Sequence, residues 1–104
     1  MPRIIVLFNL KQGVGAAQYE AWARSTDAPA VKRLAAVQGF SVHRSTQLLG
    51  SQSPPPYAYV EVLDVTDIDD LLADLSSETM QKIAAEFQAF ADNPQFIVTQ
   101  DVVR

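Results

Sequence analysis

Four segments of the chain have the apolar, β-branched pattern of β-strands. Residues 3–10 (RIIVLFNL) show no helical spacing and precede a glycine-containing segment, which predicts a strand buried on both faces. Residues 57–65 (YAYVEVLDV) alternate with a period of two, which predicts a strand with two distinct faces. Residues 40–49 and 95–103 are predicted as the second and the fourth strand. Three successive prolines make residues 50–56 a loop, because proline cannot sit inside a sheet.

Helical spacing marks the region between the first two strands, but it is interrupted. Residues 16–23 have helical spacing, residues 25–29 (STDAP) break it, and it resumes until Gly39. We therefore predict a broken helix that ends at Gly39. Its apolar positions are Tyr19, Trp22, Ala23, Val31, Leu34 and Val37.

Two helices are predicted in the second half of the chain. Residues 66–75 indicate a short helix with Thr66 as N-cap and acidic residues in its first turn. Residues 76–91 carry an apolar stripe at helical spacing, and Asn93-Pro94 ends it. The order β-α-β-β-α-β is that of an α+β, ferredoxin-like fold, in which a four-stranded antiparallel sheet has both helices on one face.

The sheet is predicted to be apolar on both faces, although its helices cover only one. We expect the uncovered face to pack against a second copy of the chain, since an open apolar face of this size favours aggregation. The sequence therefore predicts a homodimer. In this interpretation the partner-facing residues are Ile4, Val6, Phe8, Ala58, Val60 and Val62, and the helix-facing residues are Ile5, Leu7, Asn9, Tyr57, Tyr59, Glu61 and Leu63.

Composition excludes several classes of function. The 104 residues predict a single domain, 1–104, and the absence of cysteine excludes disulfides, thiolate nucleophiles and iron–sulfur clusters. The net charge of −4 and the scattered Lys and Arg make a nucleic acid an unexpected partner. No stretch approaches the roughly 18 apolar residues of a membrane helix. The apolar run at residues 4–8 is too short for a secretory signal, so we expect a cytoplasmic protein that does not bind membranes.

The helix-facing layer is unusually polar for a core. Glu61 and Asn9 cost several kcal/mol to bury without hydrogen bonds, which indicates either a satisfied polar network or a wet cavity. The interruption at residues 25–29 opens space between helix and sheet, into which Asp27 or Thr26 can point beside Trp22. Alternatively, Thr26 or Asp27 only caps a second helical segment that begins near Pro29.

His43 is the single histidine and a candidate acid or base near neutral pH. On the second strand it would lie within reach of Asp27 or Glu61, although Arg44 competes with it for the inward position. The alternative is a half-exposed strand histidine with no role. A metal site of His43, Asp27 and Glu61 requires three side-chain directions to converge, so we expect no metal.

Several segments resemble known families. YEAWARSTDAPAVKRL resembles the Tyr-x-x-Trp … (His or Asp)-x-Pro pattern of the EthD-like dimeric α/β barrels. Three longer blocks, LFNLKQGVGAAQYEAWARSTDAPAV, PPPYAYVEVLDV and ETMQKIAAEFQAFADNP, resemble the RedY-like (HapK-type) proteins associated with prodiginine and related bisindole pathways. The resemblance implies a dimer of ferredoxin-like subunits with a cavity between sheet and helices in each. Many EthD-like members have His where this chain has Asp27, so the resemblance implies either a carboxylate base at that position or an electrostatic partner for a cationic intermediate.

These observations together favour a cofactor-free enzyme that acts on a small apolar aromatic molecule, of pyrrole or indole type, by hydrolysis or proton transfer. Asp27 and His43 are the predicted proton-exchanging residues. The alternatives are a carrier protein that binds such a molecule without turnover, a structural dimer without a site, and a cofactor-independent oxygenase. The residues predicted to bind the substrate are Asn9, Trp22, Tyr57, Tyr59 and Glu61.

Overall fold

Four antiparallel strands form one sheet in the order β2-β3-β1-β4 in the computed structural model, which describes residues 2–103. The sheet has two central strands, β1 and β3, and two edge strands, β2 and β4. The order of elements confirms the predicted α+β, ferredoxin-like fold. The strands are β1 (Arg3–Leu10), β2 (Val37–Arg44), β3 (Tyr59–Val65) and β4 (Ala91–Thr99).

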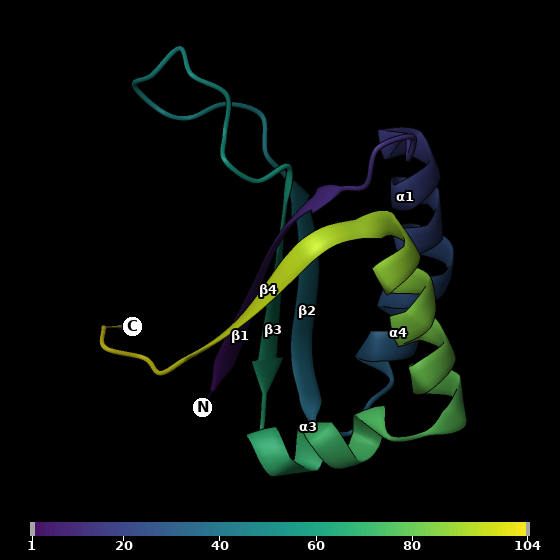
Figure 1. Ribbon diagram of the computed structural model, residues 1–104. Coiled ribbons are helices and arrows are strands. Elements are labelled where there is room, and N and C mark those ends of the chain that lie inside the picture. The colour runs from purple at the N-terminus through teal and green to yellow at the C-terminus, as the bar shows by residue number, and fades with distance from the viewer. Residues whose placement is uncertain (1, 104) are drawn as a thin grey trace.

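The helices cover one side of this sheet. Figure 1 shows α1 and α4 on the same side, with α3 at one end of the sheet and no helix on the opposite side. The β2–β3 loop and the C-terminal segment both project toward the uncovered side. Among residues 2–103, no helix is long and apolar enough to cross a membrane. The helical elements are α1 (Ala16–Trp22), η1 (Ala23–Asp27), α2 (Ala28–Lys32), α3 (Ile68–Leu75) and α4 (Glu78–Phe90).

The core lies between the sheet and the helices, and aromatic rings dominate it. Phe8 and Tyr19 are fully buried. The Phe8 ring lies edge-on to Tyr19 at 5.4 Å and to Phe87 at 5.0 Å, and stacks with Tyr59 at 5.5 Å between ring centroids. Edge-to-face and offset-stacked rings at these separations attract one another beyond the area that they bury. The cluster fixes α1 and α4 against the centre of the sheet.

The predicted direction of the β1 side chains is wrong. Val6 pairs with Glu61 and Phe8 pairs with Tyr59, and residues directly opposite each other on neighbouring strands share a face. Ile4, Val6 and Phe8 therefore face the helices, where they are buried. The error arose because both faces of β1 are apolar, so the pattern could not fix the phase of the strand.

The predicted break in the first helix is a π-helical turn. The Ala28 N–H donates to the Ala23 carbonyl, five residues back, so the helix widens instead of stopping. Pro29 has no N–H to donate to residue 25, which favours the wider turn at this point. The helix then ends at Lys32, and the prediction that it extends to Gly39 is wrong.

The wide turn keeps a row of side chains buried. Tyr19, Ala23, Asp27 and Val31 are all buried and lie four residues apart. Four residues exceed one turn of a regular α-helix by about 40°, so the row would rotate out of the core by about 120° at Val31. The π turn takes up this excess, because it contains one residue more than an α-helical turn. Asp27 therefore faces the sheet.

Other predicted boundaries shift by a few residues. Strand β2 begins at Val37, and β3 begins at Tyr59. Asp67, and not Thr66, caps α3, because its side chain accepts a hydrogen bond from the Asp70 N–H at 3.0 Å. Helix α4 passes directly into β4, so the segment at Asn93-Pro94 lies within that strand, where Asn93 adopts a φ of 48°.

The uncovered face of the sheet is apolar at its centre. Strand register places five apolar residues there, and Ile97 on β4 is 43% exposed. Polar residues lie toward the edges, with Ser41 and His43 on β2 and Gln95 on β4. The apolar residues of this face, which we call the open sheet face, are Ile5, Leu7, Val60, Val62 and Ile97.

Candidate functional site

A cavity of about 560 Å³ lies between the first helical region and the edge strand β2. This volume is within the range of about 300–1,000 Å³ that small-molecule sites usually have. Its lining combines apolar and charged side chains, so it is suited to an amphipathic molecule. The lining residues are Glu20, Ala23, Arg24, Ala28, Lys32, Phe40, Ser41, Val42, His43, Arg44, Thr46 and Tyr59.

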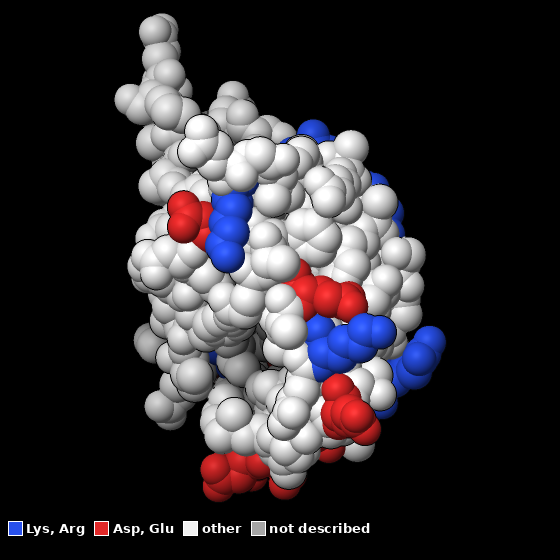
Figure 2. All heavy atoms as spheres, turned by 45° about the vertical axis from the view of Figure 1, so that its right-hand side comes forward, with Lys and Arg blue, Asp and Glu red and all other residues white. Residues whose placement is uncertain are grey.

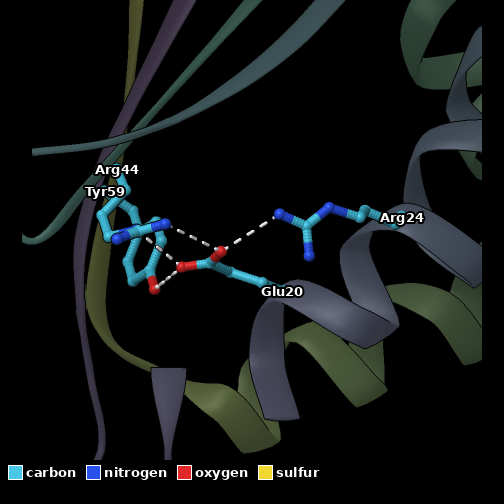
Figure 3. A network of polar contacts seen from close by, with 4 residues as sticks. All are labelled: Glu20, Arg24, Arg44 and Tyr59. Carbon is cyan, nitrogen blue, oxygen red and sulfur yellow. Dashed lines mark hydrogen bonds and ion pairs between the residues drawn. The ribbon is translucent and has the colours of Figure 1, made fainter. Parts of the chain in front are cut away.

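Glu20 on α1 connects three elements at this cavity. Its Oε2 accepts a hydrogen bond from the Tyr59 hydroxyl at 2.8 Å and pairs with Arg44 Nε at 2.9 Å. Its Oε1 accepts from Arg24 at 3.3 Å. Figure 3 shows Glu20 between the two arginines, with Arg44 and Tyr59 reaching it from the sheet. The network joins α1 to β2 and β3 across the wall of the cavity.

Two carboxyl groups, Asp27 and Glu61, are buried near each other beside this cavity. Each has an exposed fraction of 6%. Asp27 comes from the π turn and Glu61 from the centre of β3. Neither lines the cavity, but their neighbours do, since Ala28 follows Asp27 and Val42 pairs with Glu61. The site therefore has a buried acidic pair next to an accessible hollow.

The Asp27 carboxylate is buried but makes no hydrogen bond within the described residues. Every fully buried side-chain oxygen or nitrogen of residues 2–103 has a partner. The oxygens of Asp27 are therefore not fully enclosed. Glu61 differs, because its Oε2 accepts a hydrogen bond from the Tyr19 hydroxyl at 3.1 Å.

Burial raises the pKa of both carboxyl groups. Desolvation raises the pKa of Asp27 to about 6. For Glu61, desolvation and the nearby Asp27 charge raise the pKa to about 8, and the hydrogen bond from Tyr19 lowers it by a smaller amount. The two carboxyl groups therefore titrate as a coupled pair, and each binds a proton at a higher pH than a solvent-exposed carboxyl group does.

The tyrosine hydroxyls of the site are also perturbed. Burial and the hydrogen bond to Glu20 raise the pKa of Tyr59 to about 12. The pKa of Tyr19 is raised still further by burial and by the neighbouring Glu61. Both hydroxyls therefore stay protonated at physiological pH and act as hydrogen-bond donors.

The predicted substrate-binding residues do not all lie at the cavity. Tyr59 lines the cavity. Trp22 packs at 5.2 Å from the Phe90 ring and donates to Glu86 at 2.8 Å, so it faces α4. Asn9 accepts from the Ala58 N–H at 2.9 Å and thereby holds the chain at the start of β3. Tyr57, half-buried, precedes that strand. Trp22, Asn9 and Tyr57 do not line the cavity.

The prediction that His43 lies within reach of Asp27 or Glu61 is wrong for one subunit. His43 pairs with Val60, whereas Arg44 pairs with Tyr59, so the His43 side chain projects from the open sheet face and Arg44 faces the helices; because β2 is an edge strand, His43 still contributes to the lining of the cavity. Its Nε2 forms a hydrogen bond with Ser41 Oγ at 2.9 Å. Arg44 therefore takes the inward position for which the two residues competed.

The charged residues do not form a basic surface on the face drawn in Figure 2. Blue Lys and Arg atoms occur there in small separate groups beside red Asp and Glu atoms. A continuous basic stripe, which nucleic-acid binding usually requires, is absent from that face.

The model of one protein family, described as REDY-like protein HapK, matches residues 2–102. The chain belongs to the REDY-like HapK family. Among solved structures, HapK from Hahella chejuensis is 27% identical and superposes with a TM-score of 0.81, over 98% of this chain and 93% of that chain. No curated protein sequence matches the chain.

More distant structures share the fold of this HapK family member. An EthD family protein from Bacillus halodurans is 14% identical, with a TM-score of 0.75 over 98% of this chain and 99% of that chain. SnoaB from Streptomyces nogalater, described as a cofactor-independent oxygenase, is 14% identical, with a TM-score of 0.77 over 99% and 94%. Two further matches are described as dimeric proteins with a ferredoxin-like fold. The structural neighbours of this chain therefore include dimeric proteins with a ferredoxin-like fold.

Sequence reasoning missed the contributions of Glu20, Arg24 and Tyr19 to the site of this family member. One local signal existed, because Glu20 and Arg24 are four residues apart on a helix and form an ion pair. The hydrogen bonds from Arg44 and Tyr59 to Glu20 join residues that are 24 and 39 positions apart in the sequence. No local sequence pattern predicts contacts over such separations. Tyr19 belongs to an apolar stripe, so its hydroxyl gave no separate signal.

Proposed function

We propose that this protein is a cofactor-independent enzyme that moves a proton on a small aromatic molecule. The observation that carries the proposal is the pair of carboxyl groups of Asp27 and Glu61, each with an exposed fraction of 6%, whose burial raises the pKa of both groups. Such a pair supplies a base and an acid in the same place, which hydrolysis and proton-transfer rearrangements both require.

Asp27 is the proposed general base. With a pKa of about 6 it is largely ionised at pH 7, it accepts no hydrogen bond from the described residues, and its oxygens are buried but not fully enclosed. A substrate proton passes to Asp27, which becomes neutral, and the substrate keeps the electron pair and the negative charge until a proton from the pair returns to it at another atom. π turns often occur at functional sites, which agrees with Asp27 lying at the end of one.

The proposed substrate is an apolar ring system of pyrrole or indole type. Membership of the REDY-like HapK family supports this class, because the resemblance of the sequence to RedY-like proteins implies a link to prodiginine and related bisindole pathways. The cavity supports it as well, because Phe40, Val42 and the Tyr59 ring give it apolar walls. Tyr59 is the one predicted substrate-binding residue that we retain as a cavity contact.

We also propose that the protein acts as a homodimer through its open sheet face. The apolar residues at its centre include Leu7 and Val62, and relatives of the same fold are dimers. A Leu7→Lys variant is expected to elute as a monomer of 11.4 kDa by light scattering, whereas the wild type has about twice that mass. Leu72→Lys, at an exposed position on α3, is the control and should not change the mass. A monomeric wild type would overturn the proposed dimer. The single domain and the cytoplasmic location stay predictions.

Proton transfer can be tested directly with candidate pathway molecules. The wild type is incubated in deuterated buffer with pyrrole and indole intermediates of prodiginine-type pathways, and NMR and mass spectrometry follow exchange and products. Asp27→Asn is expected to abolish turnover, Glu61→Gln to reduce it strongly, and the exposed Asp69→Asn to leave it unchanged. Binding without turnover in the wild type would show a carrier instead, and consumption of O₂ would show an oxygenase. Equal turnover in wild type and Asp27→Asn would reject the role of the pair.

A further inference from the structure

The cavity beside η1 and β2 has a pattern of charge that proton transfer does not use. Its lining contains three cationic side chains, Arg24, Lys32 and Arg44, but one carboxylate, Glu20. The whole chain has a net charge of −4, so this local excess of positive charge is opposite to the average of the protein. A cavity lined in this way attracts anions.

The single carboxylate is shared between the two arginines. Glu20 pairs with Arg44 at 2.9 Å and with Arg24 at 3.3 Å. A guanidinium group has five N–H donors, so each arginine keeps donors for a further acceptor. Figure 3 shows that Arg24 reaches Glu20 through one nitrogen only, and its remaining N–H groups are not engaged by Glu20.

Lys32 has no acidic partner within residues 2–103. It lies exposed in the last turn of α2, and none of the ion pairs of the described residues includes it. Its ammonium group is therefore free to pair with an anionic group in the cavity that it lines.

The remaining walls are apolar and fit a ring. Phe40 is buried, with an exposed fraction of 8%, and its neighbours in the lining include Val42 and Ala28. Phe40 and Val42 come from β2, and Ala28 is the first residue of α2. A flat apolar molecule placed between them would bury its faces and leave its edge near the cationic groups.

We infer that the cavity binds an aromatic molecule that carries an anionic group, such as a carboxylate, with the ring against Phe40 and Val42 and the anionic group at Arg24 and Lys32. The inference rests on the proposed function, because it names the substrate class of the same cavity. The inference can nevertheless fail on its own, because an uncharged aromatic substrate would satisfy the proposed function and contradict the inference.

The test compares two probes of the same shape, indole-2-carboxylate and indole-2-carboxamide. Binding to the ¹⁵N-labelled protein is followed by amide chemical shifts in low and in high salt. In low salt, indole-2-carboxylate is expected to bind at least about five-fold more tightly than indole-2-carboxamide, because it can form a charge-assisted hydrogen bond at a partly exposed site. The preference should shrink in high salt, because mobile ions screen the interaction.

Two variants test whether the preference for the carboxylate arises in the cavity. Lys32→Gln is expected to weaken carboxylate binding about three-fold and to leave carboxamide binding unchanged. Lys82→Gln on α4, at an exposed position outside the cavity, is the matched control. Equal affinity for the two probes would overturn the inference while leaving the proposed proton transfer intact. If neither probe binds at millimolar concentration, both the inference and the proposed function are overturned. If Lys32→Gln and Lys82→Gln have equal effects, the carboxylate group does not bind at Lys32, which contradicts the inference.

Discussion

Replacing Glu61 by glutamine should stabilise the protein at alkaline pH and have little effect at acidic pH. Glutamine resembles a protonated glutamic acid in size and polarity but cannot acquire a charge. In the native state Glu61 is buried beside Asp27, and its pKa is raised from 4.5 to about 8. The wild type must therefore either hold a proton at this site or bury a second negative charge.

The size and pH range of the effect follow from these two pKa values. Between pH 4.5 and 8 the unfolded chain releases the Glu61 proton while the native chain retains it, so the free energy of unfolding falls as the pH rises through this range. The full difference corresponds to about 5 kcal/mol, at 1.36 kcal/mol for each pKa unit. Water entry around the ionised pair reduces this cost, so we expect Glu61→Gln to be more stable than wild type by about 2 kcal/mol or more at pH 9.

The assay is urea unfolding of wild type and Glu61→Gln at several pH values from 5 to 9. The two proteins should have similar free energies of unfolding at pH 5, and the difference should grow until about pH 8 and then level off. Glu78→Gln, at an exposed position in the first turn of α4, is the control and should show no such growth. A difference between wild type and Glu61→Gln that does not change with pH would refute the buried, protonated state of Glu61.

Two further substitutions probe the hydroxyl groups around the site. Tyr19→Phe removes the hydrogen bond to Glu61, so it should raise the pKa of Glu61 above its value of about 8. NMR titration of the carboxyl groups measures this pKa. An unchanged value would show that the hydrogen bond does not form in solution. Glu20→Gln removes a charge that raises the pKa of Tyr59, so ultraviolet titration of that phenol should give a value below about 12, and no decrease would contradict the contact between Glu20 and Tyr59.

The strands were predictable from the sequence where their two faces differ. Strand β3 alternates between residues such as Glu61 and Val62, and the predicted inward direction of Tyr59 and Glu61 is confirmed by their burial. Strand β1 is apolar on both faces, so either phase satisfied the pattern, and only its register with β3 decides between them.

The site was predictable in its residues more than in its geometry. Asp27 and Glu61 were named because a carboxyl group within an apolar pattern requires an explanation. The π turn that directs Asp27 inward was not foreseen, because its sequence signal, a polar segment followed by Pro29, is also that of a helix end. The contacts of Glu20 depend on which edge strand lies opposite α1, and tertiary packing alone determines that.

Helix α4 and strand β4 share a boundary without any connecting residue, since Phe90 ends one and Ala91 begins the other. A hinge needs a few residues whose backbone angles can change freely, and none separates these two elements. Ala91 and Asp92 pair directly with Leu10 and Asn9 of β1, so a displacement of α4 would first break these two backbone pairs. Helix α4, against which Trp22 packs, is therefore held in place by β4. The cavity can adapt to ligands of different size only through movement of α1 and α2.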